Sequence, residues 1–143
     1  MSVLINGCQN NFPYPEIKNF GCYYLTLCKW AELNKEFVFN ESEIINNFER
    51  YKKLAWIGVN SWIKEPVKII NDLMKENKFT TAEFSKFIPD TNYFPVFYDS
   101  KITHFVLGKK NNNEAEIVFD GWNPSAKDRG LTPAILNPYR KFK

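Results

Sequence analysis

Three residues that lie far apart in the sequence have the side chains that thiol nucleophilic catalysis needs: Cys22, His104 and Asp120. In such a site the histidine takes the proton of the cysteine thiol, and the carboxylate orients the imidazole and selects its tautomer. Each residue also has a structural interpretation: a buried cysteine, a structural histidine on a strand, and a turn residue beside Gly121. Taken jointly, the three residues favour catalysis.

Cys22 begins an apolar segment that follows a loop ending in Gly21. The segment predicts a helix closed by Asn34 and Lys35, with its polar residues on one narrow stripe at about 100° per residue. Such a helix belongs in a core. Cys22 projects onto the edge of the polar stripe in the first turn, where the helix N-terminus favours a thiolate. Cys28 projects to the opposite, apolar side, so the two cysteines have different roles.

His104 and Asp120 lie in a predicted β-hairpin. The segments 93–98, 101–108 and 115–120 are rich in β-branched and aromatic residues, and residues 109–114 form a polar turn. If the hairpin is centred on Asn112, residues whose numbers add up to 224 face each other, which places His104 opposite Asp120 on one face. A shift of the register by one residue would break this pairing.

The remaining segments predict an α+β protein. Asn40 and Glu43 form a capping box for a helix that runs to Leu54, and Pro66 stands near the first turn of another helix. A second capping signal predicts a short helix within residues 78–90. Residues 1–18 favour an N-terminal arm of turns and extended backbone, and the tail after Asp120 is rich in turns.

Composition limits the classes of function. A chain of 143 residues with 44% hydrophobic residues is typical of one domain, here 1–143. The net charge of +3, from 19 basic and 16 acidic residues, is too weak to indicate nucleic-acid binding. No signal peptide and no membrane-spanning run is visible, which predicts a cytoplasmic protein without a membrane partner. Three cysteines without a Cys-x-x-Cys motif, and one histidine, indicate neither a disulfide framework nor a zinc site, and no cofactor is expected.

Three motifs carry a resemblance to a known group of enzymes. Phe20-Gly-Cys-Tyr-Tyr-Leu-Thr-Leu, Thr103-His-Phe-Val-Leu-Gly and Ile117-Val-Phe-Asp-Gly-Trp-Asn-Pro resemble, in this order, the Cys box, His strand and Asp strand of papain-like cysteine peptidases. The small bacterial leader-peptide-processing type is the most similar, and peptidoglycan-cleaving relatives also resemble the chain. The Gly-Cys-Tyr-Tyr box and the segment around Asn60 and Pro66 are similar to an uncharacterised family carried on spirochaete plasmids and other mobile elements.

The resemblance implies a papain-like fold, with the Cys22 helix packed on a small antiparallel sheet and two or three further helices. It also implies that Cys22 is the nucleophile, His104 the general base and acid, and Asp120 the orienting residue. One position departs from the pattern: about six residues before the cysteine, where papain-like enzymes have an oxyanion-hole glutamine, this chain has Glu16, and a carboxylate would repel the oxyanion. Gln9 or Asn19 could take this role together with the backbone N–H of Cys22, although neither has the expected spacing.

Two functions from different classes follow. The first is a thiol hydrolase that cleaves an amide bond in a peptide or protein substrate, an isopeptide or a cell-wall stem peptide; transfer or deamidation of a glutamine side chain would use the same residues. The second is a non-catalytic papain-like binding protein of a mobile element that inhibits a host protein, with Trp56, Trp62 or Trp122 as anchors. High reactivity of Cys22 favours the first, and a Cys22 buried without contact to His104 favours the second. If the N-terminal arm covers the site, Tyr14 and Pro15 regulate access.

Overall fold

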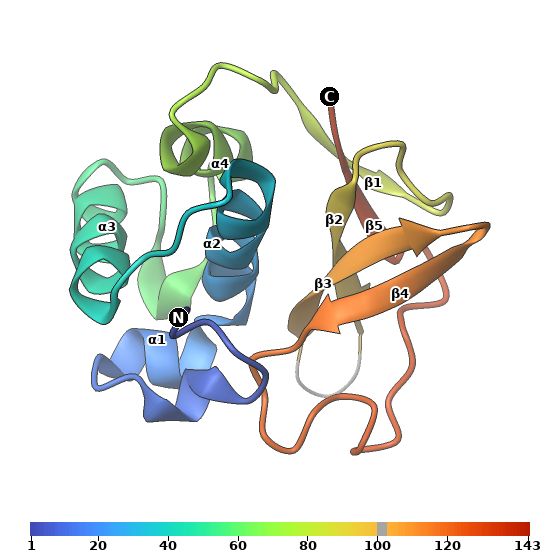
Figure 1. Cartoon of the computed structure of the whole chain (residues 1–143), viewed down its shortest axis with the longest axis horizontal. Coiled ribbons are helices and arrows are strands. Elements are labelled where there is room, and N and C mark those ends of the chain that lie inside the picture. The colour runs from blue at the N-terminus through green and yellow to red at the C-terminus, as the bar shows by residue number, and fades with distance from the viewer. Residues whose placement is uncertain (100–102) are drawn as a thin grey trace.

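The computed structural model of the chain describes residues 1–99 and 103–143 as an α+β fold (Figure 1). Along the chain the helices precede the strands. Two short 3₁₀ turns, η1 (Cys8–Asn11) and η2 (Val59–Ser61), lie within the helical part. The helices are α1 (Pro15–Phe20), α2 (Cys22–Lys35), α3 (Glu41–Lys53) and α4 (Pro66–Met74). The strands are β1 (Ala82–Ser85), β2 (Tyr93–Tyr98), β3 (His104–Asn111), β4 (Glu114–Phe119) and β5 (Tyr139–Phe142).

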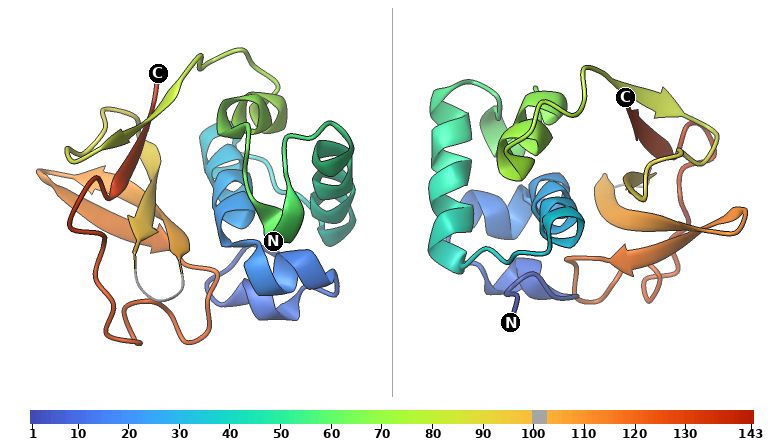
Figure 2. Two further views of the ribbon diagram at one scale, coloured as in Figure 1. Left: turned by 180° about the vertical axis from the view of Figure 1, so that it is seen from behind. Right: turned by 45° about the horizontal axis from the view of Figure 1, so that its top comes forward.

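The helices occupy one half of the molecule and the sheet the other, as both views of Figure 2 show. The sheet is antiparallel with the strand order β1-β5-β2-β3-β4. Helix α2 lies between the two halves and contacts β2 and β3 as well as α1 and α4. Tyr24, Leu25, Leu27 and Cys28 of α2 are fully buried. The expected architecture, a central Cys-bearing helix on a small antiparallel sheet with further helices, is confirmed.

Helices α3 and α4 form where the local signals predict them. The Asn40 side chain accepts a hydrogen bond from the Glu43 N–H at 2.8 Å, and the Glu43 side chain accepts one from the Asn40 N–H at 3.0 Å, which completes the capping box. Pro66 is the first residue of α4. Within the described residues, no helix is both long enough and apolar enough to cross a membrane.

The prediction for residues 1–18 is confirmed in part: turns, bends and the 3₁₀ turn η1 occupy the segment up to Tyr14, but α1 begins at Pro15. Pro15 occupies the first turn of α1, where its missing N–H is tolerated, so it starts a helix instead of preventing one. Leu4, Phe12 and Ile17 are buried in the main core. The segment is thus an integral part of the fold. Helix α1, and not the expected loop, precedes Gly21, because α1 ends at Phe20.

The short helix predicted within residues 78–90 is wrong. Residues 82–85 form β1, which pairs with β5 from Ala82↔Phe142 to Ser85↔Tyr139. The tail predicted as turns supplies β5, the strand between β1 and β2. Each strand is four residues long and gains its hydrogen bonds from the other, so tertiary pairing overrides the local capping signal.

The β3–β4 hairpin forms as predicted, but its register differs. Asn111 pairs with Glu114 and Gly108 with Ile117, one residue away from the predicted pairing. Val118 is then an extra residue in a β-bulge, so Leu107 pairs with Phe119. The bulge shifts the pairing by a second residue. Because each one-residue shift moves a side chain to the opposite face of the sheet, two shifts leave Asp120 on the same face as His104.

Candidate active site

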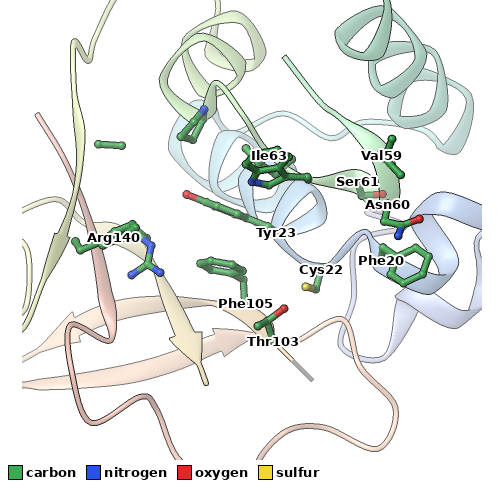
Figure 3. Close-up of a pocket in the computed structure, with 14 residues that line it drawn as sticks. Phe20, Cys22, Tyr23, Val59, Asn60, Ser61, Ile63, Thr103, Phe105 and Arg140 are labelled. Atoms are coloured by element: carbon green, nitrogen blue, oxygen red, sulfur yellow. The ribbon is translucent and has the colours of Figure 1, made fainter. Parts of the chain in front are cut away.

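Cys22 lies in the wall of a cavity of about 400 Å³ between the helical half and the sheet. Most lining side chains are apolar, and Figure 3 shows the ring planes of Tyr23 and Phe105 in its middle. These two rings stack with a centroid distance of 3.9 Å. One wall is η2, whose Asn60 and Ser61 adopt left-handed backbone with φ of 55° and 59°. An apolar hollow with a few polar side chains is the usual form of a small-ligand site.

Burial favours the protonated form of the Cys22 thiol. Burial raises its pKa to about 11, and hydrogen bonds from the backbone N–H groups of Phe105 and Tyr23 only partly oppose this effect. Loss of hydration thus opposes the thiolate that the start of α2 is expected to favour. A thiol in this state needs a nearby base to react at neutral pH.

His104 is fully buried and holds a short hydrogen bond with Asp120. Its Nε2 lies 2.7 Å from Oδ1 of Asp120. Burial raises the pKa of the Asp120 carboxyl, but the hydrogen bonds from His104 and from the backbone N–H groups of Ala126 and Trp122 outweigh it, so the pKa is below its usual value. The ionised Asp120 carboxylate accepts a hydrogen bond from the N–H at Nε2. In this tautomer of the neutral imidazole, Nδ1 carries no proton and is the basic nitrogen.

The Nδ1 atom of His104 is buried and has no hydrogen-bond partner among the described residues. Burial lowers the pKa of His104 more than Asp120 raises it, so the imidazole is neutral at pH 7. The next residue, Phe105, lines the cavity together with Cys22, whereas His104 itself is not among the residues that line it. No hydrogen bond joins His104 to Cys22 in residues 1–99 and 103–143. Catalytic hydrogen bonds are often long without substrate.

The N-terminal segment holds Asp120 in place. The N–H of Asp120 donates to the Asn6 side chain at 3.0 Å, and its carbonyl accepts from the N–H of Gly7 at 2.9 Å. The N–H of Gln9 donates to the carbonyl of Gly121 at 3.0 Å. Tyr14 packs against Phe48 of α3, at 5.3 Å between ring centroids. The segment therefore fastens the carboxylate strand, and none of its first nineteen residues lines the cavity, contrary to the hypothesis of a regulatory arm.

The three tryptophans considered as anchors have different environments. Trp122 stacks on the imidazole of His104 with 3.5 Å between ring centroids and so shields the His104–Asp120 hydrogen bond from one side. Trp56 stacks on Tyr51 at 5.5 Å. Trp62 is 68% exposed and stands at the cavity. Of the three, only Trp62 is placed to touch a ligand there.

The oxyanion candidates are not gathered at the thiol. Glu16 forms an ion pair with Lys52 and is absent from the cavity lining, and Asn19 is exposed on α1. Gln9 is buried beside Gly121; its Nε2 donates to the Lys18 carbonyl at 3.2 Å, and its Oε1 has no partner among the described residues. Backbone N–H groups in the first turn of α2 have no partner within the helix, so that of Cys22 remains a candidate donor.

Sequence reasoning missed two residues of the cavity, Tyr23 and Arg140. Tyr23 follows the cysteine, and the sequence pattern does not distinguish it from the other apolar residues of the helix. Arg140 belongs to the Tyr-Arg-Lys-Phe segment of β5, which reads as a basic chain end. Its two aromatic residues, Tyr139 and Phe142, are a weak strand signal that could have indicated β5.

Metal chemistry has no visible basis in the described part of the chain, residues 1–99 and 103–143, where no group of three or more His, Cys, Asp or Glu side chains is suitably placed to bind a metal ion. Thiol chemistry would need a thiol, a base and an orienting carboxylate, the roles predicted for Cys22, His104 and Asp120.

Comparison with known proteins gives a family and no activity. No curated protein and no solved structure matches the chain. The resemblance to papain-like peptidases and the setting on spirochaete plasmids therefore stay predictions. A family model does match residues 6–137, which include Cys22, His104 and Asp120. The chain belongs to the family described as protein of unknown function, DUF261.

Proposed function

We propose that this DUF261 protein is a papain-like thiol hydrolase that cleaves an amide bond of a peptide or protein through an acyl-enzyme. The observation that carries the proposal is the state of His104: Asp120 holds Nε2, while Nδ1 is buried, basic and unpartnered among the described residues. A buried nitrogen without a partner is unfavourable for folding alone. A catalytic site in which Nδ1 must accept the thiol proton accounts for the missing hydrogen-bond partner.

The chemistry follows from these atoms. As Sγ of Cys22 attacks the amide carbonyl carbon, the thiol proton passes to Nδ1 of His104 and an S–C bond forms. Asp120 stabilises the imidazolium without taking its proton. The C–N bond then breaks, and the proton on Nδ1 passes to the leaving amine. Water, deprotonated by the same nitrogen, hydrolyses the thioester and frees the thiol. Attack on a glutamine side chain would give deamidation by the same steps.

The test is the rate of Cys22 alkylation by iodoacetamide against pH, followed for each cysteine by mass spectrometry. If His104 assists the thiol, the rate at Cys22 levels off above the histidine pKa, and His104→Gln lowers it by about 100-fold or more. Cys8, whose pKa burial raises to about 11, is the internal control: its rate should climb steadily with pH toward that pKa and should not respond to the substitution.

A Cys22 rate that climbs steadily toward pH 11 and ignores His104 would refute the hydrolase. That outcome would favour the second candidate, a non-catalytic protein of a mobile element that binds and inhibits a host protein. The raised Cys22 pKa, the absence of a Cys22–His104 hydrogen bond in the described residues and the exposed Trp62 support this candidate. Under it, Trp62→Ala weakens partner binding, whereas Cys22→Ala leaves it unchanged.

A further inference from the structure

Arg140 is a buried cation in the wall of the Cys22 cavity. It is only 8% exposed and lies on β5, where it pairs with Phe84 of β1. Its guanidinium carbon is 4.1 Å from the ring centroid of Phe84, 4.8 Å from that of Phe97 and 5.3 Å from that of Phe105. Aromatic faces attract a guanidinium, so the three rings hold the charge in position.

No carboxylate neutralises this charge within the described residues. Nη1 of Arg140 donates to the carbonyls of Asn137 and Tyr139, at 3.1 and 3.4 Å, and no described residue accepts from its Nε or Nη2. A buried charge normally has an ionic partner, since leaving water is costly for an ion. The missing partner of Arg140 and its place in a cavity wall point to an anion that enters with the ligand.

The Tyr23 hydroxyl is a second donor at the same end of the cavity. In Figure 3 the hydroxyl end of Tyr23 is directed to the side where Arg140 lies, and Cys22 lies beyond the opposite edge of the stacked Tyr23 and Phe105 rings. Burial raises the pKa of Tyr23, against the opposing effect of the Arg140 charge, so the hydroxyl keeps its proton. No residue in 1–99 and 103–143 accepts a hydrogen bond from it, whereas the hydroxyls of Tyr24 and Tyr51 donate to the Ile44 carbonyl and to Asp72.

We propose that the ligand of the Cys22 cavity carries a carboxylate, which Arg140 and the Tyr23 hydroxyl bind at the end opposite the thiol. This inference rests on the proposed function in that it names the class of its substrate: an amide with an anionic group and apolar atoms between that group and the reacting carbonyl. The planar fork of a guanidinium matches a carboxylate with two parallel hydrogen bonds. The carboxylate is either a peptide C-terminus or an acidic side chain.

Binding to the Cys22→Ala protein tests this inference without any reaction. The probes are three peptides measured by calorimetry: acetyl-Ala-Phe-Ala with a free C-terminus, and acetyl-Ala-Phe-Glu and acetyl-Ala-Phe-Gln as C-terminal amides. We expect at least one of the two carboxylate peptides to bind about tenfold more tightly than the neutral glutamine peptide. Preference for the first assigns the site to a chain end, and preference for the second assigns it to an acidic side chain.

Substitutions then locate the carboxylate. Arg140→Met should remove the preference and leave binding of the neutral peptide unchanged, and Tyr23→Phe should reduce the preference about threefold or more while keeping the ring stack. Arg129→Met is the matched control, because Arg129 also lies over an aromatic ring, Trp122, at 4.1 Å, but is exposed and outside the cavity. If Arg140→Met does not fold, as judged by circular dichroism, Tyr23→Phe decides.

Equal affinity for the three peptides, or no binding of any, overturns the inference, as does a preference that survives Tyr23→Phe and Arg140→Met. The outcome is separable from that of the hydrolase. A carboxylate preference in a protein whose Cys22 is unreactive would support the Arg140 site and refute the hydrolase. A reactive Cys22 in a protein without the preference would support the hydrolase and refute the Arg140 site.

Discussion

His104 links the candidate chemistry to folding, because its protonation would disturb both. Burial lowers its pKa below 6.5 in the folded protein, so below that pH the unfolded chain takes up a proton that the folded protein refuses. The lowered pKa of Asp120 acts in the same direction: its stabilisation is complete above its ordinary value of 3.8 and is lost as the pH falls through its folded value. Both groups make the fold less stable in acid.

A pH series measures the histidine contribution directly. We expect the free energy of unfolding in urea to fall by about 1–2 kcal/mol between about pH 7 and pH 5. His104→Gln should remove most of this slope, since the chain has one histidine. Equal slopes in the two proteins would mean that His104 has the same pKa folded and unfolded.

At the residue scale the sequence anticipates contacts whose chemistry is distinctive. A lone histidine and an aspartate on adjacent strands were sufficient to predict the His104–Asp120 pair, although the predicted register lacked the Val118 bulge that brings it about. The Arg140 site could not be predicted in this way, because its members lie on β5, β1, β2, β3 and α2 and meet only through tertiary packing.

At the scale of elements, the junction of α1 and α2 positions the thiol. Gly21 joins the two helices, and its N–H donates to the carbonyl of Ile17 at 2.8 Å. A Cβ at this position would lie 2.6 Å from that carbonyl oxygen and 2.8 Å from the Ile17 Cα, both backbone atoms that cannot turn away. Only glycine lets α1 approach the start of α2 so closely.

Gly21→Ala should therefore separate the helices and move Cys22. We expect a loss of about 1–3 kcal/mol in the free energy of unfolding and a changed alkylation rate at Cys22. Gly58→Ala is the matched control, because there a Cβ meets the flexible Lys64 side chain at 3.3 Å, and its effect should be small. Equal stability of the two variants would contradict this account of the junction.

Helices α3 and α4, which have strong signals in their own residues, were predicted well, whereas the strands that depend on distant partners, β1 and β5, were not, and β1 formed against a local capping signal. The capping box of α3 and the proline of α4 are local, and both helices form as expected. Strands β1 and β5 are four residues each and are stabilised by each other across more than fifty residues of sequence. A short segment of this kind has no local pattern strong enough to reveal its partner.

At the scale of the whole molecule, β5 ties the sheet to the helices. Phe142 is 3% exposed and packs against Trp30 of α2 and against Phe79, with centroid distances of 5.0 and 5.6 Å. The same strand carries Arg140 into the cavity. Stability and the proposed ligand site therefore share one short element.

Phe142→Ala should destabilise the protein by about 3–5 kcal/mol, because it leaves a void between helix and sheet. Urea unfolding followed by the fluorescence of the four tryptophans measures this value. Phe87→Ala is the control: Phe87 is 71% exposed, and its removal should change stability by less than about 0.5 kcal/mol. Similar effects of the two substitutions would argue against a joining role for β5.

Strand β5 is also the last element of the fold to be synthesised. It follows every other element in the chain and yet lies inside the sheet, next to β1 and β2. A ribosome delivers the Cys22 helix more than a hundred residues before it delivers Arg140. Until then a growing chain holds the thiol without the cation of the opposite wall. Protein interrupted before residue 139 would thus contain the proposed nucleophile without the cation of the proposed carboxylate site.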